Sequence, residues 1–334
     1  MANAPIKTAV LDDYQGVAFK CADWSSIAPR LAINVYDDTV HDEDAIVRRL
    51  EPYTIICAMR ERTKFPRSVL GRLPNLKLLT TTAMRNRGID VAAANERGIV
   101  VCGTQVKGDS TTEHNWALLM AIARHIPTEH ANIQEGNKRW QSTVPTGLHG
   151  RTIGLVGLGN LGKSTAKIAQ AFNMRVVAWS PHLTPERAEE AGVAFAASKE
   201  ELMGQSDFIS IHMVLADSTR GIIGAPELAA MKPTAYLINT SRGPIVDEGA
   251  LVSALKEKKI AGAALDVYDV EPLPLDHPLR TLDNVVLSPH LGYVSEENYK
   301  VFWEHTVENI TAFLDNTPQP RLIHPQWCVC MCNF

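Results

Sequence analysis

The sequence predicts an α/β protein built from two parallel sheets. Three observations predict this class. Short apolar runs alternate with amphipathic runs along the first hundred residues, a glycine-rich turn stands between an apolar run and a helical stretch near the middle, and the alternation resumes after that turn. The chain is 45% hydrophobic and 21% charged, which is typical of a globular protein. Its 334 residues are enough for about two domains.

The first alternation occupies the first hundred residues. Helices are expected over 42–50 and 89–96. Strands that alternate with helices in this way form a parallel sheet with helices on its faces. The expected strands are 8–11, 31–35, 54–58, 76–82 and 99–102.

Two helical stretches follow this unit. Ser110, Thr111 or Thr112 is expected to cap the first, which is apolar over 116–126 and is expected to end at Pro127. The second is expected over 129–140. A second alternation then begins, with strands at 152–157, 175–180, 207–212, 235–239, 262–267 and 285–287.

The last expected helix, 296–314, comes after the second sheet is complete. We therefore expect it to return to the first unit and to make that domain discontinuous. The predicted domains are 1–103 with 294–334, and 104–293.

The glycine-rich turn has the sequence G-L-G-N-L-G and opens the expected helix 163–172. Gly157 allows a tight turn, Gly159 lets the backbone approach a pyrophosphate, and Gly162 lets the helix pack closely on the strand. Free amides at the helix start then hold the phosphates. The residues predicted to bind a dinucleotide here are Gly157, Gly159, Asn160, Leu161 and Gly162.

The end of the next strand bears on which nicotinamide cofactor binds. NAD sites usually place an acid there for the ribose 2′-hydroxyl, but 177–182 contains none and Ser180 occupies the expected position. A serine does not repel a 2′-phosphate, and His182 and Arg187 add positive charge nearby. Both NAD and NADP remain open.

Three polar residues later in the chain suit one reaction. They are Arg242 in N-T-S-R-G, Glu271 before a proline, and His290 in S-P-H-L-G. An arginine binds a carboxylate through two hydrogen bonds, a histidine moves a proton, and a second acid holds that histidine. Together with the nucleotide site they predict hydride transfer on a small 2-oxo or 2-hydroxy acid.

These motifs make the chain similar to the D-isomer-specific 2-hydroxyacid dehydrogenases, the family of glyoxylate/hydroxypyruvate reductases and phosphoglycerate dehydrogenases. The resemblance covers nearly the whole chain, and four motifs in the same order carry it. They are H-G-R-T-I-G before the glycine turn, L-I-N-T-S-R-G, A-L-D-V followed by E-P, and S-P-H-L-G.

The resemblance implies a doubly wound Rossmann cofactor domain and a smaller flavodoxin-like substrate domain. It implies that Arg242 binds the substrate carboxylate and carbonyl, that His290 protonates the carbonyl oxygen, and that Glu271 holds His290 by a hydrogen bond. A glutamate at 271 also argues for a 2-oxo acid and against formate. Further cofactor contacts are implied at Ser180, His182, Thr240, Arg242, Asp266, His290 and Gly292, with Asp266 receiving the nicotinamide carboxamide.

The chain departs from the family pattern at 82–88. Relatives offer glycine backbone amides to the substrate carboxylate there, whereas this chain has bulkier and cationic residues. We expect Met84 and Arg85 to contact the substrate together with Arg242, and Arg60 to join them from the loop after the third strand. Glyoxylate, hydroxypyruvate, phosphoglycerate and longer 2-oxo acids all remain open.

The resemblance also implies a homodimer formed by the cofactor domains, with helix 110–126 as the contact element. A buried connecting helix would have the same apolar composition. The net charge of −4 provides no broad basic field for nucleic acid or acidic membranes, and the apolar run 116–122 is too short to span a bilayer. A cytoplasmic enzyme without a metal is expected.

Two alternatives stay open. Cys328, Cys330 and Cys332 alternate near the end of the chain, which suggests either a soft-metal or redox tail or an untethered terminus; the spacing is not that of zinc pairs. A non-catalytic NAD(H)-binding protein, similar to the corepressors related to this family, would keep the same three polar residues. A test of 2-oxo acid reduction distinguishes that function from an enzyme.

Overall fold

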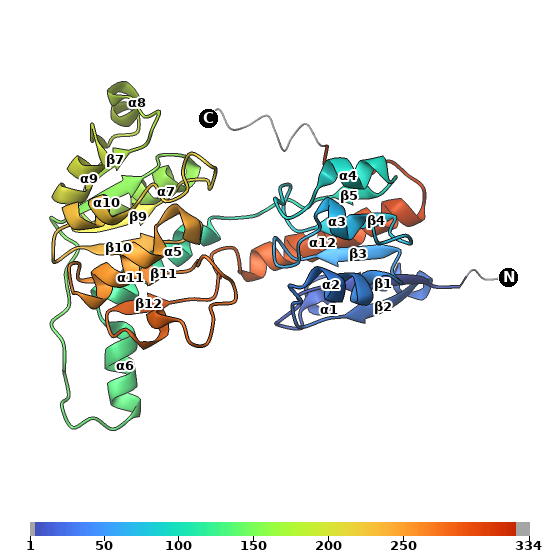
Figure 1. The fold of residues 1–334 in the computed structure, drawn as a ribbon, viewed down its shortest axis with the longest axis horizontal. Helices are drawn as coiled ribbons and strands as arrows, with labels where there is room; N and C mark the ends of the chain where they lie inside the picture. The colour runs from blue at the N-terminus through green and yellow to red at the C-terminus, as the bar shows by residue number, and fades with distance from the viewer. Residues whose placement is uncertain (1–3, 325–334) are drawn as a thin grey trace. The chain divides into compact units, whose positions relative to one another are not determined.

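The computed structural model describes residues 4–324, and the chain forms two compact units (Figure 1). Unit 1 comprises 1–108 and 294–334, and unit 2 comprises 109–293. Each unit contains one sheet whose named strands are all parallel, which confirms the predicted α/β class. The cysteines predicted as a tail, Cys328, Cys330 and Cys332, lie outside the described residues.

The sheet of unit 1 has the strand order β2-β1-β3-β4-β5. This is the order of flavodoxin-like folds. β3 and β4 are buried at every position, because helices cover both faces of the sheet, and this explains their continuous apolar or small sequences. The strands are β1 (Ile6–Val10), β2 (Leu31–Val35), β3 (Ile55–Ala58), β4 (Leu78–Thr81) and β5 (Val100–Cys102).

The longest helix of unit 1 is α12, which packs against α1 and β4 of that unit. Ser295 caps its first turn by accepting a hydrogen bond from the backbone N–H of Asn298. Beyond α12, Leu322 pairs in antiparallel fashion with Cys102 at the free edge of β5. The helices of this unit are α1 (Ala18–Cys21), α2 (Glu43–Leu50), α3 (Arg67–Leu70), α4 (Val91–Glu96) and α12 (Glu296–Leu314).

The sheet of unit 2 has the strand order β12-β11-β10-β9-β6-β7-β8. Its chain order reverses beside β6, which pairs with β7 on one side and with β9 on the other. In doubly wound sheets, ligands bind at the carboxyl ends of the strands at such a switch point. The strands are β6 (Thr152–Val156), β7 (Arg175–Trp179), β8 (Ala194–Phe195), β9 (Phe208–Ile211), β10 (Tyr236–Asn239), β11 (Gly262–Leu265) and β12 (Val285–Leu287).

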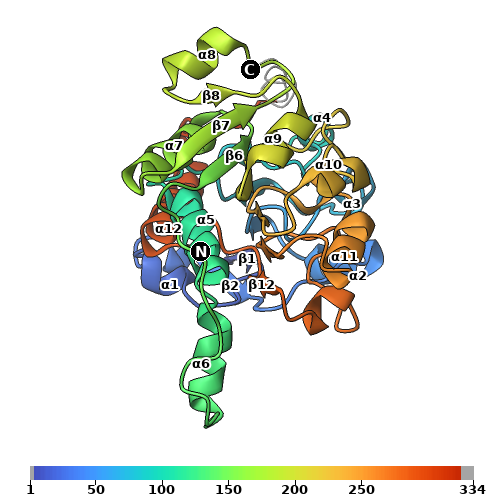
Figure 2. The same ribbon diagram turned by 90° about the vertical axis from the view of Figure 1, so that its left-hand side faces the viewer.

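Helices cover both faces of this sheet. Trp116 and Leu119 of α5 share one core cluster with Ala166 of α7, whereas Leu202 of α9 and Leu251 of α11 belong to another. α6 and the chain after it extend from the body of the unit (Figure 2). The helices are α5 (Ser110–Ala123), α6 (Ile126–Gln134), α7 (Asn160–Ala171), α8 (Pro185–Glu190), α9 (Lys199–Gln205), α10 (Ala225–Ala230) and α11 (Glu248–Lys256).

The predicted boundary at Pro127 is wrong. α5 ends at Ala123, and Pro127 lies in the first turn of α6, where its missing N–H breaks no helical hydrogen bond. The predicted cap at 110–112 is also wrong, because these residues lie inside α5 and its N-cap is Asp109, which makes no side-chain cap. His125, which caps α6, has a left-handed φ of 51°, so the chain changes direction there. The helix expected over 129–140 stops at Gln134, and the two-residue strand β8 was not predicted.

Candidate active site

The glycine turn joins β6 to α7. Gly157 has a φ of +103°, and a Cβ there would lie 2.7 Å from the backbone oxygen of His212. A Cβ on Gly162 would collide with the backbone oxygen of Gly157, so the helix packs closely on the turn only because this residue is glycine. Gly159 is the N-cap of α7, has open space at its Cβ position and makes no side-chain cap. Its open surface and the uncapped first-turn amides fit a pyrophosphate group.

The next strand, β7, ends at Trp179, and the partly exposed Ser180 follows it directly. The side chain of Arg187 donates from Nη1 to the backbone oxygen of His182 over 3.3 Å. The guanidinium is therefore held near the residues predicted to face the ribose. The first acid after the strand is Glu186, in the first turn of α8.

Arg242 is positioned by the end of β10. The side chain of Asn239 accepts from the backbone N–H of Ser241 and donates to the backbone oxygen of Arg242, each over 3.0 Å. The Ser241 hydroxyl donates to the oxygen of Ile211 over 2.7 Å, which fixes this turn to β9. Arg242 Nη1 donates to the oxygen of Ser241 over 2.6 Å. These bonds fix the backbone from which the guanidinium projects.

Asp266 directly follows β11 and is fully buried. Its Oδ1 accepts hydrogen bonds from the Ser288 hydroxyl, from the backbone N–H of Leu291 at 2.8 Å, and from His114 Nε2 at 3.1 Å. Its Oδ2 accepts from the backbone N–H of Gly292 at 2.8 Å. Burial raises the pKa of Asp266, but the bonds from His114, Ser288 and Leu291 outweigh it and hold that pKa below its ordinary value.

Glu271 and His290 form the pair that the sequence predicts. Glu271 Oε2 lies 2.6 Å from His290 Nδ1, and Oε1 accepts from the backbone N–H of Tyr268 at 3.0 Å. The carboxylate therefore fixes a proton on Nδ1 and directs Nε2 away from it. His290 has a left-handed φ of 55°, and its backbone N–H donates to the oxygen of Asp266 over 2.9 Å.

Two predicted substrate loops lie in unit 1, at the ends of β3 and β4. Arg60 and Ala83 have left-handed φ values of 52° and 69°. The backbone N–H of Arg60 donates to the Thr82 hydroxyl at 2.9 Å, and that of Ala83 donates to the Thr104 hydroxyl at 2.8 Å. The buried amide of Asn86 donates to the oxygen of Arg60 at 2.5 Å. These bonds tie the two loops to each other and to the chain after β5.

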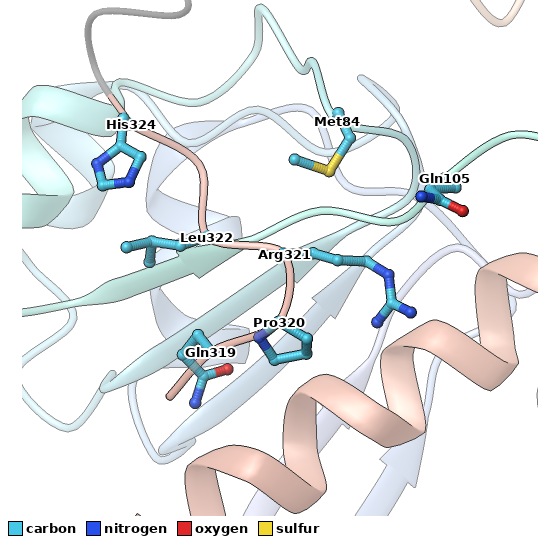
Figure 3. Close-up of a pocket in the computed structure, with 7 residues that line it drawn as sticks. All are labelled: Met84, Gln105, Gln319, Pro320, Arg321, Leu322 and His324. Atoms are coloured by element: carbon cyan, nitrogen blue, oxygen red, sulfur yellow. The ribbon is translucent and has the colours of Figure 1, made fainter. Parts of the chain in front are cut away.

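Met84 and Arg85 are adjacent in sequence but differ in their surroundings. Arg85 is exposed, whereas Met84 lines a cavity of about 360 Å³ within unit 1 (Figure 3). Met84 therefore packs against the interior of unit 1, whereas Arg85 lies at its surface. The other residues that line the cavity are Gln105, Gln319, Pro320, Arg321, Leu322 and His324.

Sequence reasoning missed several residues that organise these turns. His114 and Asn115 are polar residues at the start of an otherwise apolar helix, and that contrast was the available signal. Ser288 and Asn86 carried no comparable signal, because their partners lie in other strands or loops. Within 4–324, no group of three His, Cys, Asp or Glu side chains is arranged to hold a metal ion, and no helix is long and apolar enough to cross a membrane.

Comparisons with known proteins show the family to which the chain is related. Residues 116–292 match the family model described as "D-isomer specific 2-hydroxyacid dehydrogenase, NAD binding domain". A glyoxylate reductase of Korarchaeum cryptofilum is 39% identical over 77% of this chain and 79% of that protein. A D-3-phosphoglycerate dehydrogenase of Methanocaldococcus jannaschii is 38% identical over 78% of this chain, which spans about half (49%) of that protein. The crystal structure of a phosphoglycerate oxidoreductase from Vibrio cholerae superposes with a TM-score of 0.86 and 35% identity, covering 93% of this chain and 100% of that one.

The glycine turn yields a paired prediction. Gly162→Ala should destabilise the fold by about 1–3 kcal/mol, because its Cβ meets backbone that cannot move aside. Gly159→Ala should leave the melting temperature unchanged but raise the Kd for NADH or NADPH about tenfold or more, because its methyl group would occupy the approach of the pyrophosphate. Thermal melts and fluorescence titrations measure the two effects. Unchanged nucleotide affinity in Gly159→Ala would show that the phosphates bind elsewhere.

Proposed function

The chain belongs to the D-isomer-specific 2-hydroxyacid dehydrogenase family, and from this premise we propose that it reduces a small 2-oxo acid of the glyoxylate or hydroxypyruvate kind to the D-2-hydroxy acid. It is an oxidoreductase that uses a nicotinamide cofactor. The observation on which the proposal rests is the Glu271–His290 pair, in which His290 Nδ1 is hydrogen-bonded to the Glu271 carboxylate. We assign the cofactor to unit 2 and part of the substrate contacts to unit 1.

The chemistry of the chain's own residues follows from this pair. Reduction builds negative charge on the carbonyl oxygen, so a proton donor at that oxygen lowers the barrier. His290 Nε2 donates this proton, and Glu271 stabilises the imidazolium and its orientation from the other side of the ring. Arg242 binds the substrate carboxylate and polarises the carbonyl. A bound nicotinamide supplies the hydride.

The cofactor is NAD or NADP. Ser180 offers a hydroxyl where NAD sites usually have an acid, and Arg187 adds a cation beside His182. These features support acceptance of a 2′-phosphate without excluding NAD. Because nicotinamide cofactors are supplied inside the cell, the proposal places the enzyme in the cytoplasm.

The loop that departs from the family pattern supports a second contact with the substrate anion. Arg85 is exposed at the end of β4, and the left-handed Ala83 directs the loop that carries it. Its guanidinium, with Arg60 and Met84, is proposed to hold the carboxylate together with Arg242. An added cation strengthens ground-state binding more than it lowers the barrier.

The arm formed by α6 and the residues after it, 126–144, supports a homodimer. Four large apolar side chains on it are exposed by 56%, 60%, 76% and 93%: Ile126, Ile133, Trp140 and Val144. Exposed apolar side chains gathered on one projecting segment indicate a protein interface. Most apolar residues of α5, the contact element that the resemblance implies, are buried inside unit 2. We therefore propose the arm as the contact in its place.

The first test is a panel of 2-oxo acids with NADH and NADPH, followed by absorbance at the wavelength of the reduced cofactor. The wild-type protein should oxidise one cofactor with at least one acid. His290→Gln should lower kcat by about 10²- to 10⁴-fold and leave cofactor affinity intact, because only the proton donor is lost.

Two results would contradict this proposal. A His290→Gln variant with near-normal reductive kcat would remove His290 from the chemistry. A wild-type protein that binds NADH but reduces no acid of the panel would favour the non-catalytic NAD(H)-binding alternative. The ratio of kcat/KM for the two cofactors gives the NAD or NADP preference directly.

The second test concerns Arg85. Arg85→Ala should raise KM for the best 2-oxo acid about tenfold while kcat changes little, since one charge-assisted hydrogen bond is lost. Arg87→Ala is the matched control, because Arg87 is an exposed cation of the same loop. Equal KM values in the wild type and Arg85→Ala would exclude the contact, and equal effects of the two variants would show that only the loop's overall charge matters.

The third test concerns the dimer. Size-exclusion chromatography with light scattering should give twice the mass of one chain, and the double variant Trp140→Glu, Val144→Glu should shift the protein to single chains. Leu275→Glu, at a side chain that is 90% exposed outside the arm, should leave the dimer intact. A wild-type mass of one chain at micromolar concentration would refute the dimer.

A further inference from the structure

Asp266 gathers hydrogen bonds from three separate parts of unit 2. One donor comes from α5, through His114; one follows β12, through Ser288; and two are backbone N–H groups of Leu291 and Gly292. The carboxylate has no exposed surface, so these donors replace the water it would otherwise bind. Its position is therefore fixed by protein groups alone.

The turn that carries His290 depends on this carboxylate. His290 itself donates through its backbone to the oxygen of Asp266, and the two residues after it donate to the side chain. His290 is not glycine, yet it has a left-handed φ of 55°, a conformation that persists only where its surroundings determine it. The backbone N–H groups of His290, Leu291 and Gly292 all donate to Asp266, so this one residue holds the backbone of the turn.

His114 is the one side-chain donor to Asp266 that comes from a helix. Its Nε2 lies 3.1 Å from Asp266 Oδ1 and 2.7 Å from the Ser288 hydroxyl, and its side chain is 20% exposed. A buried carboxylate that loses a donor is less well held and accepts backbone N–H groups less firmly. The imidazole N–H of His114 therefore stabilises Asp266 Oδ1, the same oxygen that accepts the backbone N–H of Leu291.

We propose that His114 is a positioning residue for His290. By sharing its one Nε2–H between Asp266 Oδ1 and the Ser288 oxygen, it keeps the carboxylate in place for the backbone of 291 and 292. The turn then presents His290 to Glu271 in the observed pairing. The inference rests on the proposed function for its kinetic consequence. Its structural consequence, a turn held by His114, can be measured without substrate or cofactor.

Two substitutions separate the donated hydrogen bond from the bulk of the side chain. His114→Leu keeps the volume and removes the donor, whereas His114→Gln places an amide N–H where Nε2 stands. His114→Leu should lower kcat about tenfold or more, with KM for the 2-oxo acid within about threefold of wild type. His114→Gln should stay within about threefold of wild type in both constants.

Hydrogen exchange in the protein without cofactor gives the second readout. The amides of Leu291 and Gly292 should exchange about tenfold faster in His114→Leu than in the wild type or in His114→Gln. The amides of β6 should not change, because that strand makes no contact with this cluster through the bonds described. A general loss of stability would accelerate both segments.

Each outcome decides the inference. Wild-type kcat and exchange in His114→Leu would overturn it, and so would a His114→Gln variant as impaired as His114→Leu. Should His114→Leu not fold, Ser288→Ala removes the other side-chain donor from the same oxygen and should accelerate exchange of the same two amides. A wild-type protein without reductase activity would refute the proposed function alone, since the exchange experiment would still test the role of His114.

Discussion

The parallel alignment of the strands in unit 2 is the constraint on which the site depends. In a parallel sheet all carboxyl ends reach the same edge, so residues far apart in sequence meet there if each directly follows a strand. The pairing of β6 with β7 and β9, and of β11 with β10 and β12, places six such positions along one edge. The residues that directly follow β6, β7, β9, β10, β11 and β12 are Gly157, Ser180, His212, Thr240, Asp266 and Ser288.

Several polar side chains at that edge are buried or partly buried, and residues of one helix, α5, form hydrogen bonds with four of them. Asn115 Oδ1 accepts from Ser210 in β9 at 2.9 Å and from Thr240 after β10 at 3.3 Å, while His114 reaches Asp266 and Ser288. Two consecutive residues of α5 thus connect the ends of four strands. The buried apolar residues of α5, such as Trp116, Leu119 and Ile122, belong to a core cluster of unit 2, so one helix both contributes to the core and fixes the site.

Local patterns in the sequence predicted the parts of the molecule that depend on neighbouring residues. Gly157 and Gly162 of the β6–α7 turn are needed because a Cβ at either position would strike nearby backbone, and the spacing of the glycines predicted this turn. Pro127 was misread, because a proline is compatible with the first turn of a helix as well as with the end of one. His114 was missed because its partners are 152 and 174 residues away in sequence, and no local pattern records such a distance.

Residues with left-handed backbone conformations follow several strands of both sheets. Asp12, Arg60 and Ala83 follow strands of unit 1 with left-handed φ values, and His290 does so in unit 2. Each such conformation lowers the stability of the fold by about 1–3 kcal/mol and is disfavoured by the residue's own backbone preference. In each case a long-range hydrogen bond to a side chain or backbone oxygen supports the neighbouring backbone, as Asn86 does for Arg60. The sheets provide fixed hydrogen-bond partners for these turns. The strained turns direct side chains, such as that of His290, in directions that a regular strand does not allow.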